Sequence, residues 1–279
     1  MSAGTASVEA WSGKDRADEN FPVGSALIRR DLRPHVHAFY AFARNADDIA
    51  DSAELAAEEK IARLDVMEAV LLGAGGEGSP SATGLRKSLA ETGVTARHAT
   101  DLLVAFRRDA TKLRYADWEE LNDYCRYSAM PVGRHVLDLH GEDQATHPPS
   151  DALCTALQVL NHLQDCQQDF LALDRCYLPQ DLLARNDATI GELRGERASA
   201  GLRRTFDGLL ERIATLNVVA MDLPRRTRSR RLRLETAAIV GLSRRLCGRL
   251  RREDPVRGRV RLRRSDFALS LLSAFRFLP

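Results

Sequence analysis

The chain has 279 residues, of which 44% are hydrophobic and 29% are charged, a balance typical of a folded globular protein. No stretch approaches the ~20 consecutive apolar residues of a membrane span, and the N-terminal stretch lacks the apolar centre of a signal peptide. The five cysteines form neither CxxC pairs nor an even set. We therefore expect reduced, buried thiols in a cytoplasmic protein, and we do not expect a secreted, collagenous or membrane-spanning one.

The net charge of +2 hides an asymmetry between the two ends of the chain. Residues 225–264 contain 16 arginines against three acidic residues, so the rest of the chain is acidic. Such a basic segment predicts contact with phosphate groups, either of a substrate or of anionic lipid headgroups. A solvated arginine-rich surface is the alternative interpretation, because a charge excess alone defines no site.

Apolar residues recur at helical spacing through most of the chain, whereas sustained strand alternation is absent. Polar or glycine-rich breaks fall at 72–84, 140–151 and 185–197. We expect one all-α domain of about eight helices over residues 1–279, with a loose tail through about residue 20. The apolar spacing predicts helical segments over 32–51, 54–72, 95–114, 117–140, 151–172, 201–222, 232–252 and 266–278.

The segment 32–51 carries a polar stripe. Tyr40, Arg44, Asp47 and Asp51 follow steps of four, three and four residues, which keeps them on one helix face. Asp48 lies about 100° around the helix and could reach the same ligand from the side. Two carboxylates one turn apart repel each other, and either Arg44 or a divalent cation would offset the repulsion.

The segment 151–172 repeats this arrangement with Gln158, Asn161, Asp165 and Asp169, at steps of three, four and four residues. Two stripes that each end in an Asp-x₃-Asp pair would, if they faced each other across a bundle, form a carboxylate cage that needs metal. Oxygen ligands favour Mg²⁺, with Mn²⁺ as an alternative, over zinc. The histidine pairs of the chain lack further ligands at zinc spacing, so we expect no zinc site.

Several blocks of sequence, taken in order, resemble the squalene/phytoene synthase family. Within that family they are most similar to the bacterial branch that works in hopanoid and squalene formation. The match runs through residues 18–180, with a weaker similarity in DPVRGRVRL (254–262). The blocks are ENFPV (19–23), YAFARNADDIAD (40–51), DYCRYSAMPVG (123–133), ALQVLNHLQDCQQDF (156–170) and DRCYLP (174–179).

The resemblance implies a single isoprenoid-synthase domain, all-α, with a central cavity whose mouth binds a diphosphate through Mg²⁺. Arg44 and Arg175 would contact the diphosphate, for which a planar, permanently charged guanidinium is suited. The implied metal-binding set is Asp47, Asp51, Asn161, Asp165 and Asp169, with Asp48 beside it.

The resemblance also implies residues near the reacting carbons. Tyr177 would close over the departing group, and Tyr40 and Tyr124 would stabilise a passing cation or donate a hydrogen bond. One of Tyr40, Tyr124 and Gln158 would hold an attacking water. On the segment 117–140, Pro131 and Gly133 interrupt the regular run of bulky side chains and could leave room for a prenyl chain, with a simple proline kink as the alternative.

Three activities are open within the family. Two farnesyl diphosphates condense to presqualene diphosphate, presqualene diphosphate ionises and captures water to give hydroxysqualene, or geranylgeranyl diphosphate condenses to phytoene. Gln164 stands where condensing relatives usually carry arginine, and this lower positive charge favours the second activity. No dinucleotide fingerprint or phosphate loop is visible, so we expect no NADPH.

The implied partners are an isoprenoid diphosphate substrate, a presqualene diphosphate synthase that precedes this step and a downstream reductase. We expect no nucleic-acid partner, and an anionic membrane is a candidate contact for residues 225–279. A non-catalytic membrane-binding scaffold is the alternative class of function, although such a scaffold has no need of two matched acidic stripes.

Overall fold

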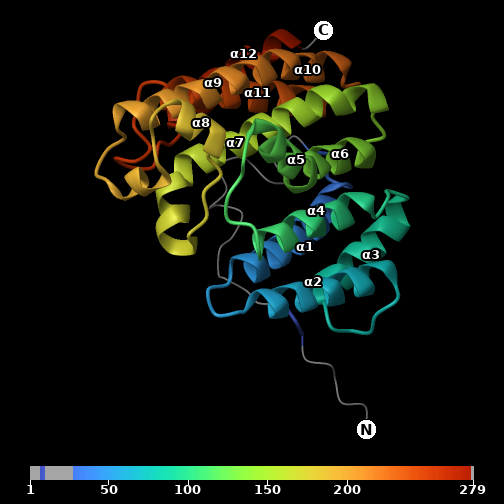
Figure 1. Cartoon of the computed structure of the whole chain (residues 1–279). Coiled ribbons are helices and arrows are strands. Elements are labelled where there is room, and N and C mark those ends of the chain that lie inside the picture. The colour runs from blue at the N-terminus through green and yellow to red at the C-terminus, as the bar shows by residue number, and fades with distance from the viewer. Residues whose placement is uncertain (1–6, 10–27, 278–279) are drawn as a thin grey trace. The chain divides into compact units, whose positions relative to one another are not determined.

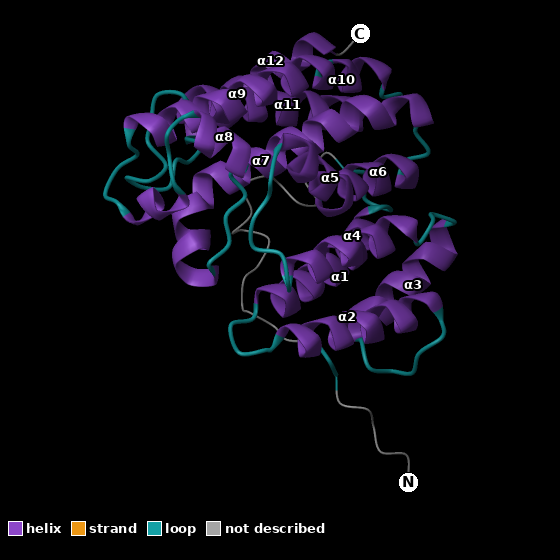
Figure 2. Cartoon of the chain, viewed as in Figure 1, coloured by secondary structure: helices purple, strands orange, loops and turns teal. Residues whose placement is uncertain are grey.

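The structure is a computed structural model that describes residues 7–9 and 28–277. The expected N-terminal tail therefore falls almost entirely outside the described residues. Helices and loops make up the described chain, which contains no strand and a single isolated bridge between Arg114 and Cys176 (Figure 2). The expected all-α class is confirmed.

Within the described residues there are twelve α-helices and three short 3₁₀ helices. The 3₁₀ helices are η1 (Gln144–Thr146), η2 (Ile190–Arg194) and η3 (Phe275–Phe277). The α-helices are α1 (Arg33–Asp51), α2 (Ala57–Leu72), α3 (Pro80–Thr92), α4 (Arg97–Asp109), α5 (Trp118–Ser128), α6 (Met130–Leu139), α7 (His147–Leu173), α8 (Gln180–Arg185), α9 (Ala200–Ala220), α10 (Asp222–Arg226), α11 (Arg230–Leu250) and α12 (Arg264–Ala274).

Three expectations about helices were wrong. The described residues contain twelve α-helices, whereas the sequence predicts about eight. The segment 117–140 is two helices, because the chain leaves helical geometry at Ala129 (φ −125°, ψ −46°), two residues before Pro131. Proline has no N–H for the helix interior but is tolerated in a first turn, which is where α6 places it. The break expected over 72–84 contains the start of α3, where the Ser79 side chain accepts a hydrogen bond from the Ala82 N–H at 3.2 Å.

The chain divides into two compact units, and the first comprises residues 1–111 and 134–141. In it α1 packs against α2, α3 and α4, which lie beside it in Figure 1. The apolar face of α1 is buried at Phe42 and Ile49, which belong to the same cluster as Leu64 and Leu102. Each such large side chain contributes about 1.5–3 kcal/mol when fully buried. This core fixes the rotation of α1 and so the direction of its polar stripe.

The second unit comprises residues 112–133 and 142–279. Its longest helix is α7, which packs against α9 and α11, while α12 packs against α11 (Figure 1). Val159, Leu160 and Leu163 of α7 are buried, as the sequence predicts for the apolar side of this segment. A single domain over 1–279 stays a prediction.

Gly133 marks a close approach of α6 and α7 within the second unit. A Cβ at this position would lie 2.6 Å from Sγ of Cys154 and closer still to Oγ of Ser150. The space beside Gly133 is thus filled by α7, and the expectation that it leaves room for a prenyl chain was wrong. Its role is tight helix packing.

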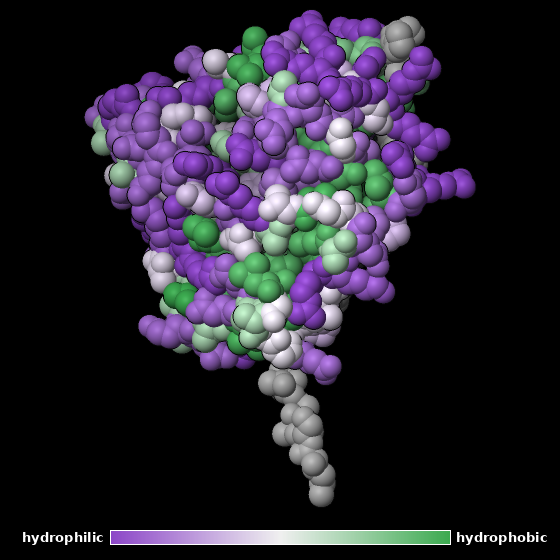
Figure 3. Space-filling model, turned by 90° about the vertical axis from the view of Figure 1, so that its right-hand side faces the viewer, coloured by the Kyte–Doolittle hydropathy of each residue, from purple (hydrophilic) through white to green (hydrophobic). Residues whose placement is uncertain are grey.

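All five cysteines are free. Burial raises the pKa of the Cys125, Cys166 and Cys176 thiols, which keeps them protonated and unreactive. The expectation of buried, reduced thiols is confirmed for these three. Among the described helices, none has the length and apolar character required to cross a bilayer. Hydrophilic residues cover most of the face seen in Figure 3, and apolar ones form small groups.

Candidate active site

The first acidic set lies on α1, whose opposite face is held by the core of the first unit. Arg44 Nη1 lies 3.0 Å from Asp47 Oδ2, and Arg44 Nη2 also pairs with Asp48. The Asp48 side chain is only 4% exposed, whereas that of Asp47 is 36% exposed. Asp48 is thus turned inward as an ion-pair partner, while Asp47 and Asp51 keep access to solvent.

Negative charge is crowded at this place. Packed neighbours desolvate the Asp47 carboxylate although part of the side chain still reaches solvent, and this desolvation, followed by the Asp51 charge, raises its pKa. Arg44 opposes the rise, and Asp109 and Asp48 add to it. Asp109 is buried at the end of α4 and belongs to no motif that sequence reasoning recognised. Packing of α4 against α1 brings it into this set.

The second acidic set lies on α7, where Gln158, Asn161, Asp165 and Asp169 are all half-buried along one side of the helix. Asp165 forms a two-point ion pair with Arg259, since Nε lies 2.6 Å from Oδ1 and Nη2 lies 2.9 Å from Oδ2. The Nη2 contact is a charge-assisted hydrogen bond, and the Nε contact is a close approach of opposite charges.

Gln164 holds the segment that supplies Arg259. Its side-chain amide donates to the backbone carbonyl of Val260, and Gln164 is 3% exposed. The lower positive charge inferred from Gln164 is therefore offset, because the loop that Gln164 anchors delivers an arginine to Asp165. Sequence reasoning noticed the similarity of residues 254–262 but assigned no role to Arg259.

The turn that ends α7 determines the positions of Arg175 and Tyr177, the next two predicted residues. Asp174 adopts a left-handed conformation (φ 50°), and the Arg175 N–H donates to the Asp169 carbonyl at 3.2 Å. Arg114 Nη2 holds the Asp174 carboxylate at 2.7 Å. The chain therefore reverses directly after the acidic stripe, with Arg175 and Tyr177 both buried.

An aromatic cluster surrounds Tyr177. Its ring stacks on that of His162, with centroids 3.5 Å apart, and lies 5.4 and 5.5 Å from the rings of Tyr115 and Tyr124. Arg175 Nη1 lies 3.5 Å from the Tyr177 hydroxyl. The structure thus brings together three predicted residues, Arg175, Tyr177 and Tyr124, and adds His162 and Tyr115, which sequence reasoning missed.

His162 is a neutral member of this cluster. Burial, then the charge of Arg175, lower its pKa to about 3, and its Nε2 has no hydrogen-bond partner among the described residues. An uncharged imidazole adds a flat, polarisable face without positive charge. This matters because a nearby imidazolium would repel a cationic intermediate.

The donor chemistry of both sets fits a hard divalent cation. Carboxylate and amide oxygens are the ligands of Mg²⁺, which binds through one or two carboxylates and completes its shell with water and substrate phosphate. Desolvation and the neighbouring carboxylates both raise the pKa of Asp47, and a bound cation would favour its charged form again. No group of three or more His, Cys, Asp or Glu side chains in the described residues is arranged to hold a metal by itself.

The remaining predicted residues occupy their helices as expected. Tyr40 is half-buried on α1, one turn before Arg44, and Gln158 is half-buried on α7, one turn before His162. The α1 set belongs to the first unit, and the α7 set and aromatic cluster belong to the second. The expectation that the two stripes face each other stays a prediction.

The sequence matches the pattern of the squalene/phytoene synthases over residues 14–266. The chain belongs to the squalene/phytoene synthase family. It is 46% identical over 270 residues to a hydroxysqualene synthase of Rhodopseudomonas palustris, covering 97% of this chain and 92% of that relative. A hydroxysqualene synthase of Sinorhizobium fredii is 47% identical over 245 residues, covering 88% and 84% of the two chains.

A solved squalene synthase, HpnC from Alicyclobacillus acidocaldarius, has the same fold with a TM-score of 0.74. It is 35% identical in sequence, and the match covers 85% of this chain and 90% of that one. The family and its all-α fold are thereby confirmed, and the chain is an enzyme of the squalene/phytoene synthase family.

Proposed function

We propose that this enzyme converts presqualene diphosphate, with Mg²⁺, into hydroxysqualene and diphosphate. As a member of its family the chain processes an isoprenoid diphosphate. The observation that carries the finer proposal is the 46% identity to a hydroxysqualene synthase across 97% of the chain. The two acidic sets and the aromatic cluster supply groups that this chemistry needs.

Departure of diphosphate requires neutralisation of the charge that develops on its oxygens. Asp47, Asp51, Asn161, Asp165 and Asp169 would hold Mg²⁺, which when bound neutralises that charge. Arg44 and Arg175 donate N–H groups to phosphate oxygens, with the planar geometry that suits them. The carbon–oxygen bond breaks, and its electron pair leaves with the diphosphate.

The carbocation that remains needs an apolar surface with electron-rich faces. The stacked rings of Tyr177 and His162, with Tyr124 and Tyr115 beside them, provide such faces. After rearrangement, a water oxygen bonds to the cation and gives up a proton. Tyr40, Tyr124 and Gln158 are the candidates to hold that water, because each carries a polar atom on a half-buried or buried side chain.

Condensation of two farnesyl diphosphates to presqualene diphosphate is the second candidate function. The ion pair of Arg259 with Asp165 favours it, because it returns positive charge to the second acidic set. In this alternative the enzyme would supply presqualene diphosphate rather than consume it.

The deciding experiment incubates the pure enzyme with farnesyl diphosphate and, separately, with presqualene diphosphate, followed by analysis of the lipid product. We expect a C30 alcohol from presqualene diphosphate alone, containing one heavy oxygen when the reaction runs in H₂¹⁸O. NADPH should change neither rate nor product, and chelation by EDTA should stop turnover. Product formed efficiently from farnesyl diphosphate, or squalene formed only with NADPH, would overturn the proposal.

The proposed reaction sets the neighbouring steps. An enzyme that condenses two farnesyl diphosphates must supply the substrate, and a reductase that removes the hydroxyl would consume the product. We place all three enzymes in the cytoplasm.

A further inference from the structure

Helix α12 buries polar side chains and leaves most of its large apolar side chains exposed. The residues that it turns toward α11 include Asp266 and Ser270, which are 7% and 0% exposed. Asp266 accepts a hydrogen bond from Arg249 Nε at 2.7 Å, and Ser270 accepts one from Arg245 Nε at 3.2 Å. The residues that it and η3 expose, by 42–66%, are Phe267, Leu269, Leu271, Leu272 and Phe275.

An ordinary surface helix buries its apolar side and exposes its polar side. The inversion cannot be undone by rotation of α12, because Asp266 and Ser270 are held by arginines of α11. The apolar side chains of α12 therefore stay exposed, and contact of so much apolar area with water is unfavourable. Exposed apolar surfaces of this kind mark interaction sites.

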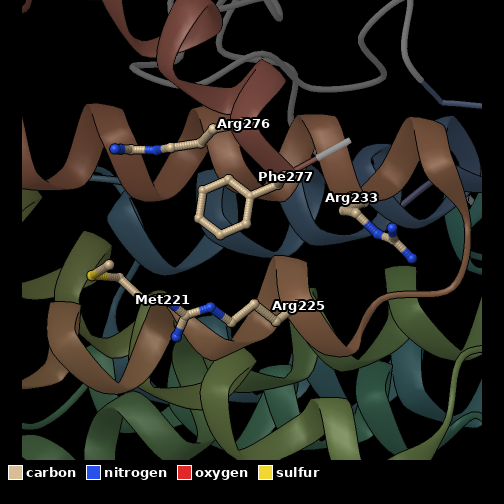
Figure 4. A pocket seen from close by; sticks show the side chains of 5 residues that line it. All are labelled: Met221, Arg225, Arg233, Arg276 and Phe277. Atoms are coloured by element: carbon tan, nitrogen blue, oxygen red, sulfur yellow. The ribbon is translucent and has the colours of Figure 1, made fainter. Parts of the chain in front are cut away.

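A pocket of about 410 Å³ opens beside the end of this helix. It is lined by three arginines, Arg225, Arg233 and Arg276, together with Met221 and Phe277. In Figure 4 the Phe277 ring lies between Met221 and Arg225 on one side and Arg276 on the other, with Arg233 beyond it. The pocket thus combines cationic donors with an apolar floor.

Few carboxylates oppose these charges. Asp222 pairs with Arg225 at 3.1 Å. Arg233 Nε donates a hydrogen bond to the Thr227 carbonyl at 2.9 Å, and this neutral acceptor does not balance the positive charge of Arg233. A second pocket of about 300 Å³ shares Met221 and adds Arg244 and Arg251. Basic groups therefore extend along α10 and α11, and Arg276 and Phe277, which follow α12, line the same pocket as two of them.

We propose that this face docks on an anionic phospholipid surface. The phosphate of a lipid headgroup enters the pocket of Arg225, Arg233 and Arg276, while the exposed apolar residues of α12 enter the boundary of the acyl chains. Exposed phenylalanine and leucine side chains beside arginines combine the two attractions that hold a protein at an anionic membrane surface, burial of apolar area and contact with charged headgroups.

The charge distribution argues against a second copy of this chain as the occupant. A two-fold contact would place the same patch on both partners and so bring the arginines of the pocket toward each other. An anionic surface complements both the apolar helix and the arginines. The proposal is independent of the active-site chemistry, since none of these residues belongs to the acidic sets or the aromatic cluster.

The test is co-sedimentation of the full chain with vesicles of phosphatidylcholine alone and of equal parts phosphatidylcholine and phosphatidylglycerol. We expect binding to the anionic vesicles only, weakened by added NaCl. The triple variant Arg225→Gln, Arg233→Gln, Arg276→Gln should lose on the order of one hundredfold in apparent affinity. Leu272→Ser with Phe275→Ser should lose about tenfold or more.

The matched control removes three other exposed arginines of the same unit, Arg197→Gln, Arg204→Gln and Arg252→Gln, and should keep most of the binding. Thermal unfolding and turnover of a detergent-dispersed substrate should stay unchanged in all three variants. Equal loss in the control, unchanged binding after loss of the α12 residues, or no vesicle binding would each overturn the proposal. So would saturable binding of inorganic phosphate without vesicle binding, or self-association that the α12 variant abolishes.

Discussion

Arg259 lies 94 residues beyond Asp165 in the chain and forms an ion pair with it, in which Nη2 donates a hydrogen bond to Oδ2 at 2.9 Å. The side chains are 33% and 23% exposed, so the pair is partly shielded from water. It joins the loop after α11 to the acidic stripe of α7. The ion pair of Asp165 can therefore be disturbed in two ways, by substitution of Arg259 itself or by substitution of Gln164, which holds the neighbouring Val260.

We expect Arg259→Gln to lower kcat/KM about tenfold, because Asp165 loses the cation that orients it. Gln164→Leu should act through the same contact, since the Val260 carbonyl loses its donor and the loop loosens, at a cost of about 1–3 kcal/mol in stability. The double variant should therefore be less impaired than the product of the single effects, as steady-state kinetics would show. Arg257→Gln, on an exposed residue of the same loop, is the control. Fully multiplicative effects would mean that the two residues act separately.

Asp51→Asn should reduce turnover by at least about a hundredfold, because one oxygen ligand of the proposed metal set is lost. In metal-free buffer the free energy of unfolding should stay equal or rise, since the substitution relieves the repulsion that raises the pKa of Asp47. Asp165→Asn should differ in that it also costs stability, because Arg259 loses its partner. Chemical denaturation with and without Mg²⁺ separates these cases. Equal destabilisation by both would indicate structural carboxylates.

Tyr177→Phe should reduce kcat only a few-fold, because the ring that stacks on His162 remains and only the contact of the hydroxyl with Arg175 is lost. Tyr177→Leu should reduce kcat by about thirtyfold, which corresponds to a desolvated cation–π contact of about 2 kcal/mol. Product analysis should show more of the early, unrearranged products with leucine. Similar rates for the two variants would show that the aromatic face has no part in the reaction.

Because of buried His135, we expect the free energy of unfolding to decrease in acid. Its ring stacks on Phe39 at 3.9 Å, neither ring nitrogen has a hydrogen-bond partner in the described part of the chain, and burial followed by the charge of His98 lowers its pKa to about 3. Asp138, which opposes this shift, and His35 are the other charged groups that act on it. The unfolded chain therefore binds the proton more readily than the folded one between about pH 6.5 and pH 3.

Stability should fall as pH drops through that window, by about 1.4 kcal/mol per pH unit from this group. His135→Phe preserves the stack and should remove that component, whereas His147→Gln, at a half-buried histidine, serves as the control. Urea denaturation at several pH values measures the slope. An unchanged slope in His135→Phe would show that other groups govern the acid limb.

Gly133→Ala should destabilise the fold by about 1–3 kcal/mol, because the added methyl group meets Ser150 and Cys154 of α7. Adding Cys154→Gly should restore part of the loss. Gly84→Ala provides the opposite control, since no atom lies within 4 Å of its added methyl group and alanine favours a helix interior by about 0.5–1 kcal/mol. Thermal unfolding measures all three, and a neutral Gly133→Ala would contradict the close packing.

The features that could be predicted from the sequence are mostly those that depend on residues close together in the chain. The apolar spacing of α1 and α7 is a property of single helices, so it located both acidic stripes and the face that each one presents. The pairing of Arg259 with Asp165 depends on how distant segments pack, and no spacing rule connects residues so far apart. The proximity of Asp109 to the first acidic set could not be predicted for the same reason, because it depends on the packing of α4 against α1.

Two errors came from ambiguous local signals. The sequence predicts one helix that contains Pro131 and Gly133. In the structure Pro131 lies in the first turn of a new helix, and Gly133 allows α7 to pack closely against that helix. The glycine- and serine-rich run before α3 concealed an N-cap at Ser79, since the same residue types favour loops and helix starts.

The long separation of Asp165 and Arg259 has a consequence during synthesis. At about 5–20 residues per second, a ribosome needs roughly 5–20 s to add the chain between them. After residue 173 has been added, α7 can be complete while its carboxylate still lacks this arginine. The acidic stripe of a nascent chain therefore remains more negative than that of the finished enzyme, and an early stop before Arg259 would release a polypeptide with that excess charge permanently in place.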